Sequence, residues 1–150
     1  MQLIDHLNLG EGFSKYFRID AALDDGLKDE VFRIRHSVYC EDLQFESTRP
    51  DGREIDHYDA RSVHCLLRTA TAPFRPVGCT RVVLTDPRDP AAPLPFEVSC
   101  AAALDRSIID PARLPRERIA EISRLAVHRD YRRRRGEEHT PVHIDNSDFS

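Results

Sequence analysis

RSVHCLLRTATAPFRPVGCTRVVLT, residues 61–85, contains two segments rich in apolar and β-branched side chains, Arg61–Ala70 and Pro76–Thr85. The residues between them include Ala72 and Pro73, which are typical of a turn. Two strands joined by so short a connection lie side by side and run in opposite directions. The sequence therefore predicts an antiparallel β-hairpin around which the other elements are arranged.

The residues before this hairpin predict a strand, a helix and a long loop. Gly12–Asp20 alternates roughly between apolar and polar side chains, as a half-buried strand does. In Leu23–Leu43 the apolar residues recur every three to four positions, which places them on one helical face. Asp24 and Asp25 suit the positive end of this helix. The polar stretch Glu46–Asp59 predicts a loop, and long loops in compact domains are often functional.

The residues after the hairpin predict a further loop, a short helix and a last strand. Asp86–Pro95 contains four prolines and is expected to be a loop, whereas Phe96–Leu104 is compatible with a short helix. Asp110–Pro115 is a second connection, and Arg118–His128 is apolar enough to predict a buried strand. This order of elements favours an α+β domain with a mostly antiparallel sheet.

The last predicted strand is followed directly by a polar tail without an amphipathic pattern, residues 137–150. A sheet edge left bare in this way is normally paired or covered. We therefore expect residues 1–136 to be the N-terminal portion of a longer domain. The tail is a candidate for disorder.

Composition is typical of a folded, soluble protein. The chain has 150 residues, of which 40% are hydrophobic and 32% charged, enough for one domain with its own core. No apolar run approaches the ~20 residues of a membrane span, and the N-terminus lacks the features of a secretory signal. We expect a cytoplasmic protein without a bound metal. Its four cysteines form no C-x-x-C pair and are expected to be buried free thiols: Cys40, Cys65, Cys79 and Cys100.

Charge is unevenly distributed along the chain. The formal net charge is -4, yet residues 113–135 hold nine arginines against three acids. A local basic patch is therefore expected. Nucleic-acid binding is disfavoured, because the overall charge is negative and aromatic residues do not interleave with the arginines.

Two candidate groups lie before the hairpin. Arg35 and Tyr39 are four residues apart, so they share one helix face, and Phe45 lies just past the helix end. These three form either an aromatic and cationic wall or an ordinary helix end with a surface arginine. Asp56 and Asp59 are suited to binding an amine, orienting a base or holding an ion, but are equally typical of a solvated turn.

Two more groups lie near the end of the chain. Glu121 and Ser123 face one side of the last strand, and Arg124 faces the other unless a bulge redirects it. A buried Glu121 would have a raised pKa suited to a general base, or would form an ion pair with Arg81 or Arg124. The run 132–136 is compatible with phosphate binding but is, by itself, more often a solvated tail. None of the histidines and cysteines has a recognisable catalytic motif around it.

One set of residues resembles the motif set of the acyl-homoserine-lactone (autoinducer) synthases. In chain order it is Arg35-x3-Tyr39-x5-Phe45, Asp56-x2-Asp59, Arg81 in GCTRVVLT, Phe96 and Glu121-x-Ser123-Arg124. Tyr39 stands for the usual Phe of that family and Phe45 for its Trp. Three segments are similar to the PEP-CTERM/exosortase system-associated acyltransferases, which also resemble N-acyl amino acid synthases. These segments are FRIRHSVYCEDLQFE (32–46), DGREIDHYDARSVHCLLR (51–68) and EISRLAVHRDYRRRRGE (121–137).

The resemblance, which runs from about Tyr16 to Gly136, implies a GNAT-like fold: a mixed, mostly antiparallel sheet with flanking helices. It implies transfer of an acyl chain to an amine from a phosphopantetheine thioester, on an acyl carrier protein or coenzyme A, with no permanently bound cofactor. Glu121 would be the general base, and Ser123 would contact the acyl carbonyl. The residues implied in substrate binding are Arg35, Tyr39, Phe45, Asp56, Asp59, Arg81, Phe96 and Arg124.

The same resemblance implies that the donor binds at Arg133, Arg135 and Gly136, which match the start of the GNAT pyrophosphate loop. Glu138 stands where that loop has Gly or Ala, and the helix and strands after the loop have no counterpart in residues 137–150. Two hypotheses follow. The chain is an N-acyltransferase that uses an amino acid or related amine, with a homoserine lactone the less expected product. Alternatively, it is a non-catalytic or truncated domain that binds an acyl carrier protein through its arginine patch.

Overall fold

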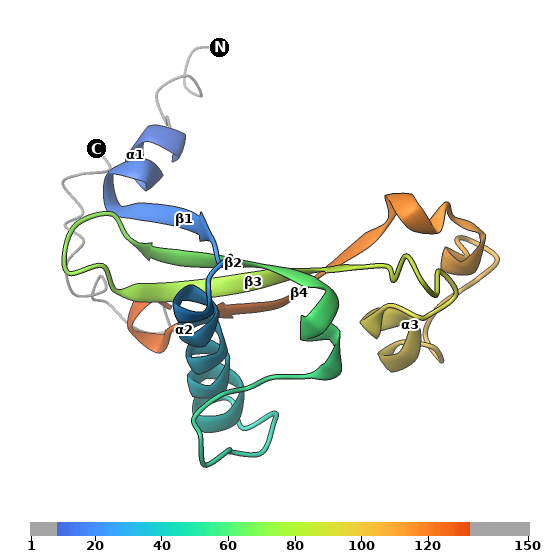
Figure 1. Ribbon diagram of the computed structural model, residues 1–150, viewed down its shortest axis with the longest axis horizontal. Helices are drawn as coiled ribbons and strands as arrows, with labels where there is room; N and C mark the ends of the chain where they lie inside the picture. Colours follow the sequence, from blue (N-terminus) through green and yellow to red (C-terminus); the bar gives the residue numbers. More distant parts are fainter. Residues whose placement is uncertain (1–8, 133–150) are drawn as a thin grey trace, which may run out of the picture.

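The computed structural model describes residues 9–132. Its centre is one antiparallel sheet of four strands in the order β1-β2-β3-β4, with helix α2 packed on one face (Figure 1). The strands are β1 (Phe17–Ala21), β2 (Ser62–Thr69), β3 (Pro76–Leu84) and β4 (Ala120–Val127). The helices are α1 (Leu9–Tyr16), α2 (Asp25–Arg35), the π-helix η1 (His36–Asp42), α3 (Pro95–Ser99) and the 3-10 helices η2 (His57–Arg61), η3 (Pro111–Arg113), η4 (Arg116–Arg118) and η5 (Arg129–Tyr131).

The predicted hairpin is present as β2 and β3. The pairing places Leu66 opposite Cys79 and His64 opposite Arg81. The same register continues into β4, where Ser123 lies opposite Arg81. Sheet order therefore follows chain order, and the antiparallel α+β fold expected from the sequence is confirmed.

The predicted helix 23–43 is also present, but in two parts. The Asp24 side chain accepts a hydrogen bond from the backbone N–H of Leu27 at 2.9 Å and so caps the start of α2. After Arg35 the helix widens into η1, which ends at Asp42. A π-helical segment of this kind often marks a functional site.

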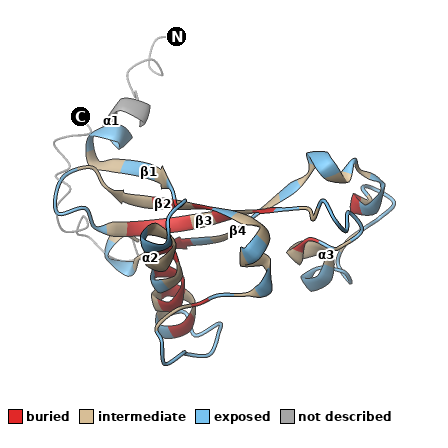
Figure 2. Cartoon of the chain, viewed as in Figure 1, coloured by how far each residue is buried: buried red, intermediate tan, exposed pale blue. Residues whose placement is uncertain are grey.

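The core lies between α2 and the sheet (Figure 2). Val31 and Ile34 of α2 and Val38 of η1 face the strands, in agreement with their helical spacing. Their partners on the sheet are Leu66, Cys79 and Ala126. Because this core is small, the ends of the elements around it depend on polar contacts.

Three expectations from the sequence are wrong in part. The predicted strand Gly12–Asp20 is mostly helix α1, and β1 begins only at Phe17. The last strand is not buried throughout, because its side chains alternate between the α2 face and an uncovered face, where Ile122 is 76% exposed. Of the four thiols, two are buried, Cys65 is half-buried and Cys100 is exposed.

Residues 86–118, between β3 and β4, form a lobe that projects beyond the sheet (Figure 1). The predicted short helix is present as the five-residue α3. Arg116 holds the lobe together: its guanidinium donates hydrogen bonds to Glu97, to the carbonyl of Pro90 at 3.0 Å and to that of Ala92 at 3.0 Å. Within the described residues, no helix has the length and apolar character that crossing a bilayer requires.

Candidate active site

Three arginines and three acids lie together where the C-terminal end of α2 meets the middle of the sheet. Arg35 comes from α2, Arg81 from β3 and Arg124 from β4. A charged group out of water is stable only when paired and hydrogen-bonded, so buried arginines of this kind need acids close by. The loop before β2 supplies those acids, and we call the whole set the ion cluster: Arg35, Glu54, Asp56, Asp59, Arg81 and Arg124.

Arg35 is fully buried and bridges two of the acids. Its Nε donates to Glu54 Oε2 at 2.5 Å, and its two terminal nitrogens donate to the two oxygens of Asp59 at 2.6 and 3.1 Å. Two parallel hydrogen bonds between a guanidinium and a carboxylate fix both groups in orientation. Arg35 is therefore not the surface arginine that the simpler sequence interpretation allowed.

Arg81 carries the ion cluster onto the sheet. Its NH1 donates to Asp56 Oδ1 at 2.6 Å and to Asp59 Oδ1 at 2.7 Å, and its Nε donates to Ser123 Oγ at 3.0 Å. One side chain on β3 thus connects the loop acids to the serine on β4.

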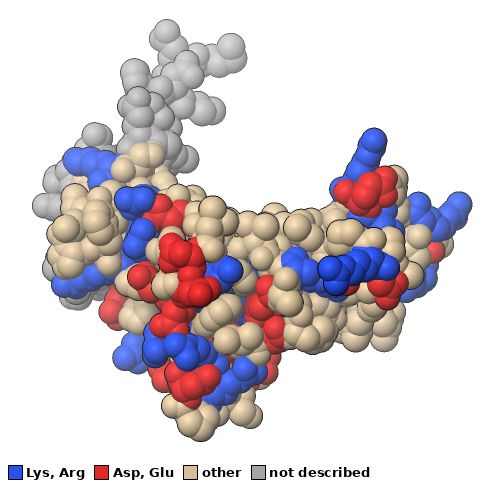
Figure 3. Space-filling view, viewed as in Figure 1, with Lys and Arg blue, Asp and Glu red and all other residues tan. Residues whose placement is uncertain are grey.

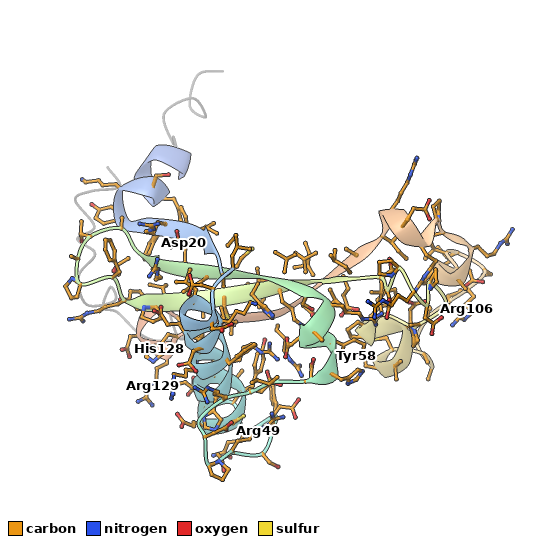
Figure 4. The ribbon with its side chains drawn as sticks, viewed as in Figure 1. Asp20, Arg49, Tyr58, Arg106, His128 and Arg129 are labelled. Carbon is orange, nitrogen blue, oxygen red and sulfur yellow. The ribbon has the colours of Figure 1, made fainter. Side chains whose placement is uncertain are left out.

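The segment that carries Asp56 and Asp59 is a structured turn. Asp56 accepts a hydrogen bond from the backbone N–H of Tyr58 at 2.9 Å, and Asp59 accepts one from that of Asp56 at 2.7 Å. These reciprocal bonds cap the 3-10 helix η2. Tyr58, labelled in Figure 4, has its ring 5.8 Å from the Arg81 guanidinium. The solvated-turn interpretation of these two aspartates is wrong.

The arginines determine how these acids ionise. Burial is the largest single influence on Asp59 and by itself would raise its pKa, but the hydrogen bonds from Arg35, the Asp56 backbone and Arg81, with the charge of Arg35, together outweigh it, so the pKa is lower than usual. Asp56 follows the same pattern: burial is the largest influence and would raise its pKa, but the hydrogen bond and charge of Arg81, with the Tyr58 backbone N–H, together lower it. Both carboxylates are charged at neutral pH.

His64 is a member of this site that the sequence interpretation left without a role. Its side chain is buried on β2, with Nε2 3.8 Å from Asp59 Oδ1 and the ring edge-on to Phe32. Burial lowers the pKa of His64, so the ring is neutral at neutral pH. The available signal was strand alternation, because His64 and the core residue Leu66 share a face.

A bulge in β4 redirects Arg124. The register between β3 and β4 shifts between Cys79 and Arg81, and Arg124 adopts a left-handed backbone with φ of 52°. Its guanidinium then lies on the α2 side of the sheet, 5.5 Å from the centre of the Tyr39 ring. Glu121, Ser123 and Arg124 therefore share one face, the arrangement that the sequence made conditional on a bulge.

Glu121 is half-buried and forms no ion pair with the arginines of the ion cluster. Its Oε2 accepts a hydrogen bond from the backbone N–H of Phe96 in the lobe at 2.8 Å. The ion pairs considered for it from the sequence are not made, because Arg81 and Arg124 pair with loop acids. Glu121 is thus a carboxylate beside the ion cluster, without an arginine partner among the contacts of the described residues.

Tyr39 and Phe45 differ in their surroundings. Tyr39 is half-buried in η1, and its hydroxyl donates to the carbonyl of Leu125 at 2.7 Å, which ties η1 to the bulge of β4. Burial raises the pKa of this hydroxyl. Phe45 is 74% exposed, because its backbone turns away after η1, so the expected wall of three side chains does not form.

The arginine-rich run 113–135 does not form one continuous patch in its described part. Arg116 is used inside the lobe and Arg124 in the ion cluster, and Arg132 pairs with Asp42. Figure 4 places Arg129 near the end of β4 opposite to the lobe, with its side chain far from the labelled Arg106. Basic and acidic side chains also intermingle over the visible face (Figure 3). The expected donor-binding residues Arg133, Arg135 and Gly136 lie outside the described residues.

The arrangement suits proton transfer on β4 beside a rigid charged scaffold. Among residues 9–132, no group of His, Cys, Asp and Glu is arranged to hold a metal ion. What the described part offers instead is a carboxylate at Glu121, a hydroxyl at Ser123 held by Arg81, and a partly exposed guanidinium at Arg124.

Comparison with known proteins agrees with the fold. The family model of the acetyltransferase (GNAT) domain matches residues 34–141. Among solved structures, the crystal structure of the AHL synthase LasI is similar, with a TM-score of 0.56 and 21% sequence identity. The similarity covers 83% of this chain and 58% of LasI, so the chain spans little more than half the length of that enzyme. At this identity the likeness concerns the fold alone.

Proposed function

The chain belongs to the acetyltransferase (GNAT) domain family, and from this premise we propose that it is an N-acyltransferase with Glu121 as its general base. The donor is an acyl thioester of coenzyme A or of an acyl carrier protein, and the acceptor is an amino acid or a related amine. The observation that carries the proposal is the position of Glu121, which lies on the same face of β4 as Ser123 and has no arginine partner among residues 9–132.

The reaction needs a base because an amine attacks a thioester only when it is neutral. Glu121 takes the proton from the incoming ammonium, directly or through one water. The amine nitrogen then bonds to the carbonyl carbon and the carbon–sulfur bond breaks. The thiolate leaves and takes up the second proton that the nitrogen loses as the amide forms. Ser123 donates its hydroxyl hydrogen to the developing oxyanion; in support of this role, its Oγ accepts a hydrogen bond from Arg81 at 3.0 Å, which leaves the hydroxyl hydrogen for another acceptor. No covalent enzyme intermediate is required.

Three residues of the ion cluster, Arg35, Asp59 and Arg81, serve this chemistry by holding the parts in place. Arg35 and Asp59 fix the end of α2 to the loop before β2, and Arg81 fixes that loop to Ser123. We further propose a cytoplasmic enzyme of the PEP-CTERM/exosortase-associated branch, on the resemblance of the three segments quoted above.

Mass spectrometry of the products tests the proposal. The chain is mixed with long-chain acyl thioesters, a pool of amino acids and S-adenosylmethionine, beside Glu121→Gln and the control Glu117→Gln, which changes an exposed glutamate of η4. We expect an N-acyl product from the wild type and the control. Loss of a general base lowers the rate by about 10²- to 10⁴-fold, which is the expected effect of Glu121→Gln.

Two outcomes would overturn the proposal. Turnover unchanged by Glu121→Gln removes Glu121 from the mechanism. A folded wild-type chain that forms no product with any thioester is not an acyltransferase by itself, and a binding role would then replace the catalytic one.

A further inference from the structure

Arg124 is held much more loosely than the other two arginines of the ion cluster. A single nitrogen, NH2, lies 3.4 Å from Glu46 Oε1, 3.2 Å from Glu54 Oε1 and 3.3 Å from Asp56 Oδ2, at or beyond the long end of hydrogen-bond distances. Its Nε is without a hydrogen-bond partner among the described residues. The side chain is 27% exposed, whereas that of Arg81 is 2% exposed. The guanidinium therefore retains hydrogen-bonding capacity.

The backbone of Arg124 is strained in the conformation that brings its side chain to the α2 side of the sheet. A non-glycine residue with φ of 52° is in the left-handed region, which costs free energy. The side-chain contacts of Arg124 are long, so the stabilisation they provide offsets little of the free-energy cost of this backbone conformation. Strain of this kind persists where a side chain must point at a ligand, so the observation directs attention to what Arg124 faces.

Glu46 is the surplus carboxylate around Arg124. The charges of Arg35, Arg81 and Arg124 are already balanced by Glu54, Asp56 and Asp59. The Glu46 side chain is 43% exposed, and its carboxylate lies 3.4 Å from the Arg124 guanidinium. Its backbone N–H donates to the carbonyl of Tyr39 at 3.1 Å, which holds the loop beside the guanidinium. Arg124 thus already faces one carboxylate that the cluster does not require.

We propose that Arg124 binds the carboxylate of the acceptor, and that Glu46 occupies this position in the free protein until the substrate displaces it. The inference rests on the proposed function and names its substrate class: amines that carry a free carboxylate. Displacement exchanges one carboxylate for another, so the net charge of the site is unchanged. A guanidinium recognises a carboxylate through charge-assisted hydrogen bonds of fixed geometry.

The spacing along β4 suits an amino acid. Glu121 and Arg124 are on one face with Ser123 between them, and at a strand rise of about 3.3 Å their Cα atoms are at most about 10 Å apart. Both side chains are long enough to approach each other across this interval. An acceptor bound by its carboxylate at Arg124 therefore presents its amine nitrogen, which is the reacting atom, towards Glu121 and beside Ser123.

Binding of two matched probes tests the inference without any turnover. N-octanoylglycine carries the acyl chain and the carboxylate of a product, whereas N-octanoylglycine amide lacks only the charge. Isothermal titration calorimetry gives Kd for each probe with the wild type, Arg124→Lys, Glu46→Gln and the remote control Glu117→Gln. We expect the wild type and the control to prefer the carboxylate probe by about tenfold, the size of a charge-assisted hydrogen bond.

The two variants should act in opposite directions. Glu46→Gln removes a weak, exposed competitor and should tighten the carboxylate probe by about two- to fivefold without affecting the amide probe. Arg124→Lys should lower the preference, because the ammonium keeps the charge but lacks the paired donors of the guanidinium. Glu46→Gln changes only an exposed loop residue, so its result stands even where Arg124→Lys destabilises the protein.

Equal affinity of the wild type for both probes, or no binding of either, would overturn the inference. So would a carboxylate probe that Glu46→Gln leaves unchanged. Because calorimetry needs no chemistry, these results are separable from those of the product assay. Carboxylate preference without turnover would sink the proposed function alone, and turnover without carboxylate preference would sink this inference alone.

Discussion

The two faces of the sheet contrast along neighbouring rows of residues. On the face covered by α2, His64, Arg81 and Ser123 lie opposite one another across three strands. One residue away along each strand, on the other face, Val63, Val82 and Ile122 form an apolar row. Val63 is 41% exposed and Ile122 is 76% exposed, whereas His64 and Arg81 are 3% and 2% exposed.

This distribution reverses the usual one, in which apolar rows are buried and polar rows face water. The covered face includes three arginines and their acids, which an apolar core would replace at no loss of stability and often with a gain. The ion cluster is therefore better explained by chemistry than by stability. The covered face sets the orientation of Ser123 and Arg124. Among the described residues, the apolar row contributes little to stability.

The largest effect is expected from Asp59→Asn. The carboxylate serves Arg35 and Arg81 together, so its loss leaves two buried guanidinium groups short of a partner. The free energy of unfolding should fall by about 3–5 kcal/mol, as for other broken buried ion pairs. Urea unfolding followed by circular dichroism measures it. Asp51→Asn, an exposed aspartate of the same loop, is the matched control, and an equal small loss for both would contradict the prediction.

A smaller, pH-dependent effect is expected from His64. Burial depresses the folded-state pKa of this histidine below its ordinary value of 6.5. The charges of Arg35 and Arg81 lower the pKa further, and the nearby Asp59 carboxylate only partly opposes them. Below pH 6.5 the unfolded chain binds a proton that the native state refuses, so stability falls as the pH drops, by at most about 1.4 kcal/mol per pH unit.

His64→Gln should remove this component of the slope between pH 7.5 and 5.5. Urea midpoints at several pH values measure it, with the exposed His57→Gln as a control that keeps the slope. A slope unchanged by His64→Gln would mean that the buried ring takes its proton as readily as the unfolded one.

The smallest effect is expected on the apolar row. Ile122→Thr keeps a β-branched side chain on β4 and alters a residue that is 76% exposed. The free energy of unfolding of this chain should change by less than about 0.5 kcal/mol. If Ile122→Thr lowered the thermal or urea midpoint as much as Asp59→Asn, the apolar row would be important for stability. The two faces would then not differ in the way described above.

Local pattern was sufficient for most of the scaffold. The hairpin, the helix from Asp25 and the strand after the lobe were all predictable, because strand alternation and helical periodicity are properties of neighbouring residues. The first strand was misplaced because Gly12–Asp20 contains too few apolar positions to distinguish a strand from a short helix. Helix α1 depends instead on its surroundings, such as the Phe13 ring 5.3 Å from that of Phe17.

The candidate site was predictable as a set of residues but not as a structure. Arg35, Asp56 and Asp59 were singled out by residue type and Arg81 by the family resemblance, yet Glu54, Glu46 and His64 were left out of the site. Glu54 is 1% exposed because it lies between Arg35 and Arg124, which come from different elements. No local signal distinguishes such a glutamate from a solvated one.

The sequence by itself determined the hairpin, the helix from Asp25, the last strand and the residue types available for chemistry. Tertiary structure decided which of those residues meet. Arg35 becomes a buried cation only because α2 ends against the loop before β2. Arg124 reaches the α2 side only through a left-handed residue in a bulge. Both outcomes depend on long-range packing, whose energy is not contained in any single segment of the chain.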